Sequence, residues 1–401
     1  MRISDLTAWH VRIPLKTTVR HASHTRRETD SIIVRCRLVD GTLGWGEGVP
    51  REYVTGETVA SVLAQLDATD LSAQLGGKLG ELDGVIKTCL DLELAALPAG
   101  PPLPRDCFGN AARCAVELAV LDAATRRAGV PLSAVTSRMP QTEEIRKSSD
   151  RARYSLAFTP TSRWKIRLRG WLLRLFGFHQ AKVKVGVEGV DDGELLALVR
   201  RTVGPRVDLR LDANEAWECD SVVEKMAPLI GFGVTSLEQP VAHHCVSGLS
   251  AVRKELAVPI MLDESLCSLS DARIAIEEQT CDLFNIRLSK CGGFLNSLRI
   301  AALAHQVGLG YQLGCQVGET GVLSAAGRHF ATSIDGIRYL EGSFDRFLVR
   351  ERLTMEDLTF GRGGYAPALT AAGLGVTVDR SALARVEVAR RDWTISSQVP
   401  T

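Results

Sequence analysis

Two lysines separated by one residue, Lys182 and Lys184, are well placed for acid–base chemistry. They lie in an Ala-Lys-Val-Lys-Val run, whose alternation of charged and apolar side chains is typical of a β-strand. A strand directs both ammonium groups to one face, where their mutual repulsion makes it costly to bring them together. The pattern therefore predicts anionic groups opposite this face.

Carboxylates follow at nearly regular intervals, each at the end of a short apolar run, and a third lysine closes the series. The residues are Asp212, Glu238, Asp263 and Lys290, and the steps from Lys184 onward are 28, 26, 25 and 27 residues. Such a step is the length of one strand, one helix and two short loops. The repeat predicts a parallel sheet, and its closed form is a (β/α) barrel whose strand ends converge on one face.

Convergence at one barrel face would place the lysines and the carboxylates around a single pocket. Carboxylates from three successive strands can hold a hard divalent cation. Mg²⁺ prefers such a site, with few carboxylates and positions left for water and substrate. The sequence thus predicts a magnesium site beside the lysines.

The same motifs resemble the signature of the enolase superfamily, in its muconate lactonizing enzyme subgroup, and the resemblance covers nearly the whole chain. The motifs are Lys182-x-Lys184, Asp212-Ala-Asn214, Glu238-Gln-Pro240, Asp263-Glu264-Ser265 and Lys290. The resemblance implies an α/β fold, with a TIM-like (β/α)7β barrel over residues 141–357. It also implies an α+β capping domain built from residues 1–140 and a returning C-terminal segment, 358–401.

The resemblance further assigns roles to these side chains. Asp212, Glu238 and Asp263 would bind Mg²⁺, for which Mn²⁺ could substitute, and Asn214 and Glu264 would orient the ligands or the substrate carboxylate. In enolase-superfamily sites a Lys or His base works beside Mg²⁺, which stabilises the enolate formed when the α-proton of a carboxylate is removed.

A neighbouring ammonium and a divalent cation both disfavour the charged form of a lysine. We therefore expect Lys184 to be the base, with Lys182 beside it contacting the substrate carboxylate. Lys290 would approach the opposite face of the same carbon.

Lysines on both faces leave several reactions open. Removal of a proton on one side and delivery on the other is racemisation or epimerisation. One acting lysine, with a second that only stabilises the enolate, is the arrangement of the family's cycloisomerases and o-succinylbenzoate synthases. We predict an isomerase, either a racemase/epimerase or a muconate-type cycloisomerase. The alternatives are a lyase, such as an acid dehydratase or o-succinylbenzoate synthase, and a barrel that binds without catalysing.

The polar connection of residues 17–27 corresponds to a family loop that folds over the barrel mouth and touches the substrate. Because arginine matches carboxylate geometry, Arg20, Arg26 or Arg27 could bind an anionic group of the substrate. The alternative is a solvated hairpin tip.

Two acidic residues near the end of the predicted barrel, Glu319 and Glu341, could line the pocket. Family members that epimerise dipeptides carry Asp-x-Asp at the end of strand 8, where this chain has Tyr339-Leu340-Glu341. Glu341 is expected either to bind a cationic group or to hydrogen-bond in the pocket wall. Glu319, after strand 7, could orient Lys290 or cap the following helix.

Residues 161–180 combine five basic side chains with nine bulky apolar ones, and no acidic residue occurs between Asp150 and Glu188. A basic amphipathic helix of this kind can lie on an anionic membrane or on a partner. The position after the first barrel strand requires a helix here, so we predict the first barrel helix with an Arg-rich outer face.

Composition limits the partners and the compartment. Forty-eight basic residues against 47 acidic ones give a net charge of +1, which provides no electrostatic reason to bind nucleic acid. The N-terminus lacks the apolar core of a signal peptide, and no run of about 18 apolar residues occurs, so we expect a cytoplasmic protein without membrane contact. Ten scattered cysteines favour reduced thiols. The expected ligand is a small carboxylate, and family members commonly form homo-oligomers.

Overall fold

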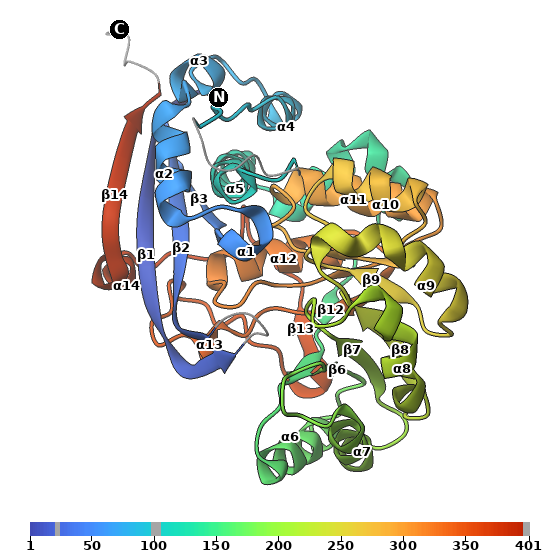
Figure 1. The fold of residues 1–401 in the computed structure, drawn as a ribbon. Coiled ribbons are helices and arrows are strands. Elements are labelled where there is room, and N and C mark those ends of the chain that lie inside the picture. The colour runs from blue at the N-terminus through green and yellow to red at the C-terminus, as the bar shows by residue number, and fades with distance from the viewer. Residues whose placement is uncertain (21–24, 98–105, 396–401) are drawn as a thin grey trace, which may run out of the picture.

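The computed structural model describes residues 1–20, 25–97 and 106–395, which are organised around two main sheets (Figure 1). The first sheet has four antiparallel strands in the order β14-β1-β2-β3. Its strands are β1 (Ile3–Arg20), β2 (Thr25–Leu38), β3 (Leu43–Gly48) and β14 (Glu387–Thr394). Because β14 pairs with β1, the C-terminal segment completes the sheet that the N-terminus begins.

The helices of this capping domain cover one face of its sheet (Figure 1). They are α1 (Glu52–Thr55), α2 (Val59–Ala68), α3 (Leu71–Leu75), α4 (Leu82–Leu90) and α5 (Asn110–Ala128). Helix α5 packs directly on the backbone of β3, where glycines alternate. A Cβ added at Gly46 would lie 2.1 Å from the carbonyl oxygen of Ala115, so glycine is required for this close approach.

The second sheet has eight parallel strands in the order β12-β11-β10-β9-β8-β7-β6-β5. Its strands are β5 (Leu156–Phe158), β6 (Gln180–Lys184), β7 (Asp208–Asp212), β8 (Val234–Glu238), β9 (Ile260–Leu262), β10 (Leu283–Ile286), β11 (Gly310–Leu313) and β12 (Ile337–Leu340). The N–H of Ser155, just before β5, donates to the carbonyl of Leu340 at the end of β12, at 2.8 Å. This bond joins the two edges of the curled sheet.

One helix connects each pair of consecutive barrel strands, which confirms the predicted (β/α)7β order. These helices are α6 (Arg163–Leu175), α7 (Asp192–Val203), α8 (Val222–Ile230), α9 (Leu249–Glu255), α10 (Leu269–Glu277), α11 (Phe294–Gln306) and α12 (Gly321–Ser333). The remaining elements are β4 (Arg151–Arg153), β13 (Tyr365–Pro367), α13 (Asp345–Leu348), α14 (Arg380–Val386) and the 3-10 turns Leu132–Arg138, Pro140–Ile145, Cys219–Ser221, His243–Gly248 and Arg362–Gly364. Within the described ranges, no helix combines the length and the apolar character needed to cross a bilayer.

Buried carboxylates of the capping domain hold it to the barrel. Glu47, on β3, accepts hydrogen bonds from the N–H groups of Thr320 and Leu323 at the start of α12, both at 3.0 Å. Glu117, on α5, accepts from the N–H of Leu295 at the start of α11, also at 3.0 Å. A helix N-terminus stabilises a carboxylate, so these contacts fix the cap over the barrel.

Candidate active site

The carboxyl ends of consecutive barrel strands carry the residues that the sequence singles out. Lys184, Asp212 and Glu238 are the last residues of β6, β7 and β8, and Asp263 directly follows β9. Lys184 is the register partner of Asp212, and Asp212 is the register partner of Glu238. The fold therefore places these side chains next to one another at one barrel end.

Lys182 is the positive centre of this group. It is buried, and its Nζ lies 3.1 Å from Asp212 Oδ2, 3.3 Å from Glu238 Oε1 and 2.8 Å from Glu341 Oε1. Burial by itself would lower the pKa of Lys182, but the three carboxylates outweigh burial and raise that pKa well above its usual value. These three ion pairs therefore favour the charged form of Lys182.

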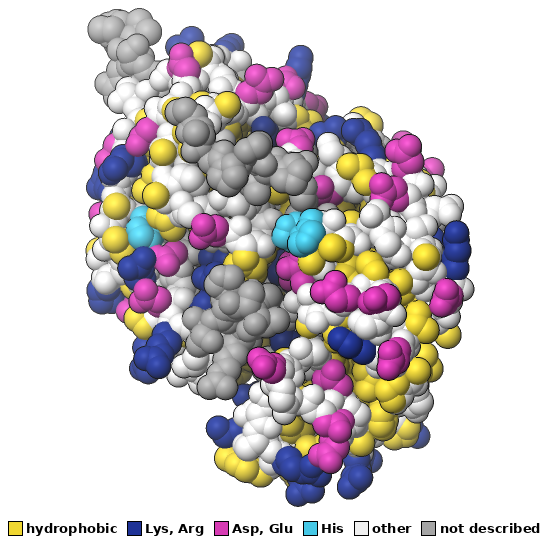
Figure 2. Space-filling view, viewed as in Figure 1, with side chains coloured by type: hydrophobic (Ala, Val, Ile, Leu, Met, Phe, Trp, Pro, Cys, Tyr) yellow, Lys and Arg dark blue, Asp and Glu magenta, His cyan; other side chains and the backbone are white. Residues whose placement is uncertain are grey.

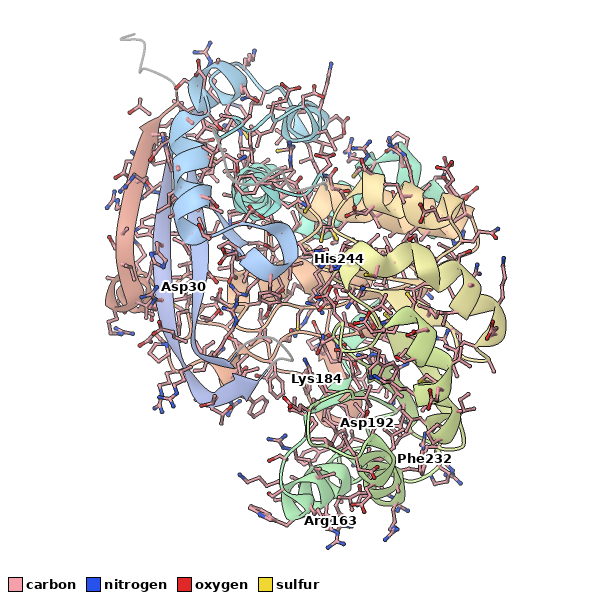
Figure 3. The ribbon with its side chains drawn as sticks, in the orientation of Figure 1. Asp30, Arg163, Lys184, Asp192, Phe232 and His244 are labelled. Carbon is pink, nitrogen blue, oxygen red and sulfur yellow. The ribbon has the colours of Figure 1, made fainter. Side chains whose placement is uncertain are left out.

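Lys184 is the less enclosed of the two β6 lysines. It is half-buried, and its Nζ donates a hydrogen bond to Asn214 Oδ1. Asn214 also donates from its Nδ2 to Glu264 Oε1 at 3.3 Å and from its backbone N–H to Asp212 Oδ1 at 3.0 Å. In Figure 3, Lys184 lies at the part of the barrel that faces the capping domain.

The structure corrects the prediction for barrel strand 6. Strand β10 ends at Ile286, so the residue at its mouth is Arg287, and Lys290 lies in the following turn. The side chain of Lys290 is fully buried, and its Nζ donates to the carbonyls of Asp263 and Asn285 and to Asp263 Oδ1, the last two at 2.9 Å. These bonds use all three donors of the ammonium.

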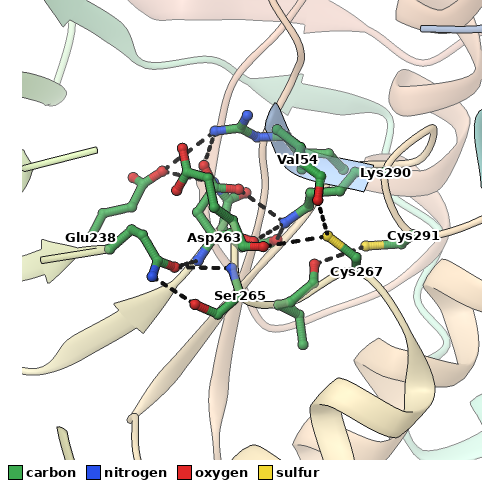
Figure 4. Close-up of polar contacts among 12 residues, drawn as sticks. Val54, Glu238, Asp263, Ser265, Cys267, Lys290 and Cys291 are labelled. Atoms are coloured by element: carbon green, nitrogen blue, oxygen red, sulfur yellow. Dashed lines mark hydrogen bonds and ion pairs between the residues drawn. The ribbon is translucent and has the colours of Figure 1, made fainter. Parts of the chain in front are cut away.

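Figure 4 shows Lys290 beside Asp263, in a layer that also contains Cys267, Cys291 and Val54 of the capping domain. The Sγ of Cys267 lies 4.0 Å from the carbonyl oxygen of Val54. Because Lys290 is fully buried and its three donors are in use, it holds Asp263 in place and does not face the barrel mouth.

Arg287 takes the position that the prediction gave to Lys290. Its guanidinium binds Asp263 Oδ2 and lies 3.7 Å from Glu238 Oε1, with 12% of the side chain exposed. In the eight-stranded order, β10 is four strands from β6, which is halfway around the barrel. Arg287 and Lys184 thus face each other across its mouth.

The sequence contains a signal for Arg287 that the spacing argument missed. Side chains alternate along an extended chain, so Arg287, the residue just after β10, is expected on the same face as Asn285. Asn285 Nδ2 donates to Glu238 Oε1 at 2.8 Å, which shows that this face is the barrel interior. Lys290 comes after the alternation has ended.

Asp212, Glu238 and Asp263 fit a divalent cation in ligand type, and they lie at the ends of three successive strands. All three are buried, and Asp212 Oδ2 has no hydrogen-bond donor, although Lys182 lies near it. Burial, followed by the charges of Asp212, Glu341 and Asp263, raises the pKa of Glu238 to about 8 despite Lys182. Such a cluster of buried carboxylates requires positive charge.

Lys182, Arg287 and Lys290 supply that charge in this arrangement. Within residues 1–20, 25–97 and 106–395, no three His, Cys, Asp or Glu side chains converge as a ready-made metal site. For a metal ion to bind Asp263 and Glu238, the guanidinium of Arg287 must move away from them.

The predicted substrate contacts have different outcomes. Glu341 binds Lys182 and also Arg210 Nη2, at 2.5 Å, so it is paired within the barrel wall. Glu319 accepts from the N–H of Gln316 at 2.6 Å in its own loop, and burial raises its pKa to about 8. The side chain of Arg20 lies outside the described residues, and Arg26 stacks on Tyr53, with Cζ 5.4 Å from the ring centre.

Comparisons with known proteins agree with this architecture. A family model described as "Mandelate racemase / muconate lactonizing enzyme, N-terminal domain" matches residues 3–135, and one described as "Enolase C-terminal domain-like" matches residues 170–382. The chain is 30% identical over 348 residues to the L-Lys-D/L-Arg epimerase of Methylococcus capsulatus, and the alignment covers 86% of this chain and 91% of that protein.

Solved structures share the fold along nearly the whole chain. The dipeptide epimerase of Cytophaga hutchinsonii, complexed with Mg and the dipeptide D-Ala-L-Val, has a TM-score of 0.82 and 24% identity, with 98% of this chain and 100% of that one covered. The muconate lactonizing enzyme of Pseudomonas fluorescens has a TM-score of 0.83 and 24% identity, with 96% and 99% covered.

The relatives are named as epimerases and a racemase, which confirms the predicted enzyme class, an isomerase of the enolase superfamily. Both domain models match in the order in which the capping domain and the barrel follow each other in the chain. The chain therefore belongs to the mandelate racemase/muconate lactonizing enzyme family of the enolase superfamily.

Proposed function

We propose that this protein is a Mg²⁺-dependent isomerase that removes the α-proton of a small carboxylate with a single lysine base, Lys184. The observation that supports a single base is the pair of groups facing each other across the barrel mouth. One is the half-buried Lys184, and the other is Arg287, whose guanidinium stays protonated in proteins. An arginine can bind and stabilise an anion, but it is a poor proton donor.

Each side chain then has a distinct part in the reaction. Lys184 Nζ accepts the α-proton, and Asn214 holds this nitrogen in place through its Oδ1. Lys182 stays charged and attracts the substrate carboxylate toward the β6–β8 edge. Arg287, once it has left Asp263, provides a second cation for the anionic intermediate. A bound Mg²⁺, or Mn²⁺ in its place, would stabilise the charge that develops on the substrate carboxylate.

The pocket wall also restricts the substrate. In the dipeptide epimerases that the sequence resembles, acidic residues at the end of strand 8 hold an ammonium group. Here Glu341 is already paired with Lys182 and Arg210, and the Tyr339 hydroxyl lies 2.9 Å from Thr235 Oγ1. We infer that the substrate carries no ammonium group at this position, which favours N-acylated amino acids and unsaturated diacids.

Single-base chemistry favours a cycloisomerase-type reaction, in which the same lysine handles the proton on one face. Epimerisation is the second candidate, because the 30% identical relative is an epimerase. It requires a proton donor on the face opposite Lys184, and the described residues place a guanidinium there.

The test follows the α-hydrogen by NMR in D₂O with Mg²⁺ and a panel of N-acyl amino acids, dipeptides and unsaturated acids. We expect exchange without inversion of the labelled centre, and loss of exchange in Lys184→Ala. The matched variant Arg287→Lys, which installs a second base, should add inversion. Inversion by the parent enzyme at the rate of exchange would overturn the single-base proposal. Exchange that persists in Lys184→Ala would overturn the role of Lys184.

A further inference from the structure

The outer face of α6 carries an apolar stripe that no part of the described chain covers. Among the described residues, 16 large hydrophobic side chains are exposed, and six of them lie between residues 164 and 176. The exposed fractions are 61% for Trp164 and for Trp171, 48% for Leu168 and 57% for Leu175. Isolated exposed apolar residues are ordinary, but a cluster of this size marks an interaction site.

The stripe lies opposite the face by which α6 packs on the barrel. Ile166, Gly170 and Leu173 are the buried residues of the helix, and a Cβ added at Gly170 would lie 2.2 Å from Thr202 Oγ1 of α7. At about 100° per residue, the four stripe residues fall within roughly 60° of one another and about 160° from the centre of the buried set. They are therefore directed away from the protein.

Basic side chains border the stripe on both sides. In helical projection, Arg163, Arg167 and Arg174 flank one side, and Lys165 and Arg169 flank the other. All five are exposed, and the one ion pair that they make with another described residue joins Arg163 to Glu194 at 2.8 Å. Figure 2 shows blue and yellow side chains together at the end of the molecule where α6 lies in Figure 1.

We propose that α6 docks this protein reversibly onto the surface of membranes that contain anionic phospholipids. Tryptophan and leucine on the outward ridge would enter the headgroup region, and the flanking arginines and lysine would reach lipid phosphates on either side. This proposal departs from the expectation of no membrane contact, and it is independent of the proposed reaction.

Two other occupants fit the surface less well. A second copy of the chain, paired symmetrically through the same ridge, would bring its basic flanks against those of the first copy, and α6 itself carries no acidic residue to offset them. An acidic protein would suit the charges, but the ridge is convex, whereas a bilayer offers both anionic groups and an apolar layer beneath them.

The test uses the full-length protein and large unilamellar vesicles of phosphatidylcholine, with or without 40% phosphatidylglycerol, in a sedimentation assay at low and high salt. We expect binding to the anionic vesicles that weakens with salt. Trp164→Gln/Trp171→Gln should weaken it on the order of tenfold or more. Arg167→Gln/Arg174→Gln should weaken it about 30-fold and reduce its salt dependence.

Matched controls lie on other exposed elements. Met355→Gln/Val388→Gln and Arg273→Gln/Arg380→Gln should bind vesicles as the parent does, and circular dichroism should show all four variants folded. Absence of binding to anionic vesicles, or equal binding by the parent and both α6 variants, would overturn the proposal. A dimer that forms without vesicles and depends on Trp171, seen by sedimentation velocity, would also overturn it. So would a Trp164→Gln/Trp171→Gln variant that binds both poly-glutamate and vesicles as strongly as the parent, because this result would indicate an acidic protein partner.

Discussion

Replacement of Lys290 by methionine separates a structural lysine from a catalytic one. The side chain of Lys290 is fully buried, and its ammonium binds Asp263 and the carbonyl of Asn285. Methionine keeps the approximate length and the apolar stem but removes the charge and all three donors.

The cost can be worked out from these contacts. Loss of one partner of a buried ion pair costs about 3–5 kcal/mol, and the lower end applies because Asp263 keeps Arg287 as a partner. The two carbonyl oxygens left without this donor add about 1 kcal/mol or more. We therefore expect Lys290→Met to lose about 4 kcal/mol of unfolding free energy.

The assay pairs urea unfolding, followed by circular dichroism, with α-hydrogen exchange measured per folded molecule. Lys184→Met should show the reverse pattern, with nearly unchanged stability and exchange reduced by about 10²–10⁴-fold. Lys254→Met, on the exposed surface of α9, is the control for the substitution itself. A Lys290→Met variant that is as stable as the parent but has lost exchange would refute the reasoning and return Lys290 to the reacting carbon.

Three further predictions concern the metal, a buried carboxyl and a glycine. Mg²⁺ should raise the thermal midpoint, because at a hundred times its Kd it adds about 2.7 kcal/mol to the free energy of unfolding. Arg287→Met should tighten Mg²⁺ binding, because the guanidinium no longer occupies Asp263. No shift of the midpoint at millimolar Mg²⁺ would exclude the site. Burial raises the pKa of Glu117 to about 7 from an ordinary 4.5, so its contribution to stability is complete below pH 4.5 and is lost as the pH rises to about 7. Glu117→Gln should flatten that part of the thermal midpoint–pH curve, and parallel curves for the two proteins would contradict the assignment. Gly46→Ala, with its Cβ 2.1 Å from the Ala115 oxygen, should destabilise by about 1–3 kcal/mol in urea unfolding, whereas Gly77→Ala, which meets open space, should not.

Much of the fold could be predicted because strand-end residues recur in the sequence at the length of one βα unit. Lys184, Asp212 and Glu238 end their strands as the spacing indicates. The ends of strands were less predictable. β1 extends to Arg20 and β2 begins at Thr25, so the strands run into the 17–27 segment that the sequence presents as a polar connection. Local propensity does not decide such ends, which depend on pairing with neighbouring strands.

By itself, the sequence determined the family, the order of the barrel units and the carboxylates at their ends, because these are encoded in residue types and in spacing along the chain. Tertiary structure decided which cation faces the pocket. Lys290 and Arg287 are only three residues apart, and the exact end of β10 directs one beneath Asp263 and the other across the mouth toward Lys184. Tertiary structure also decided which face of α6 packs on α7 and which face, with its apolar stripe, stays outside. Burial depends on the residues that pack against a side chain in the folded protein, and the sequence of α6 does not state which residues these are.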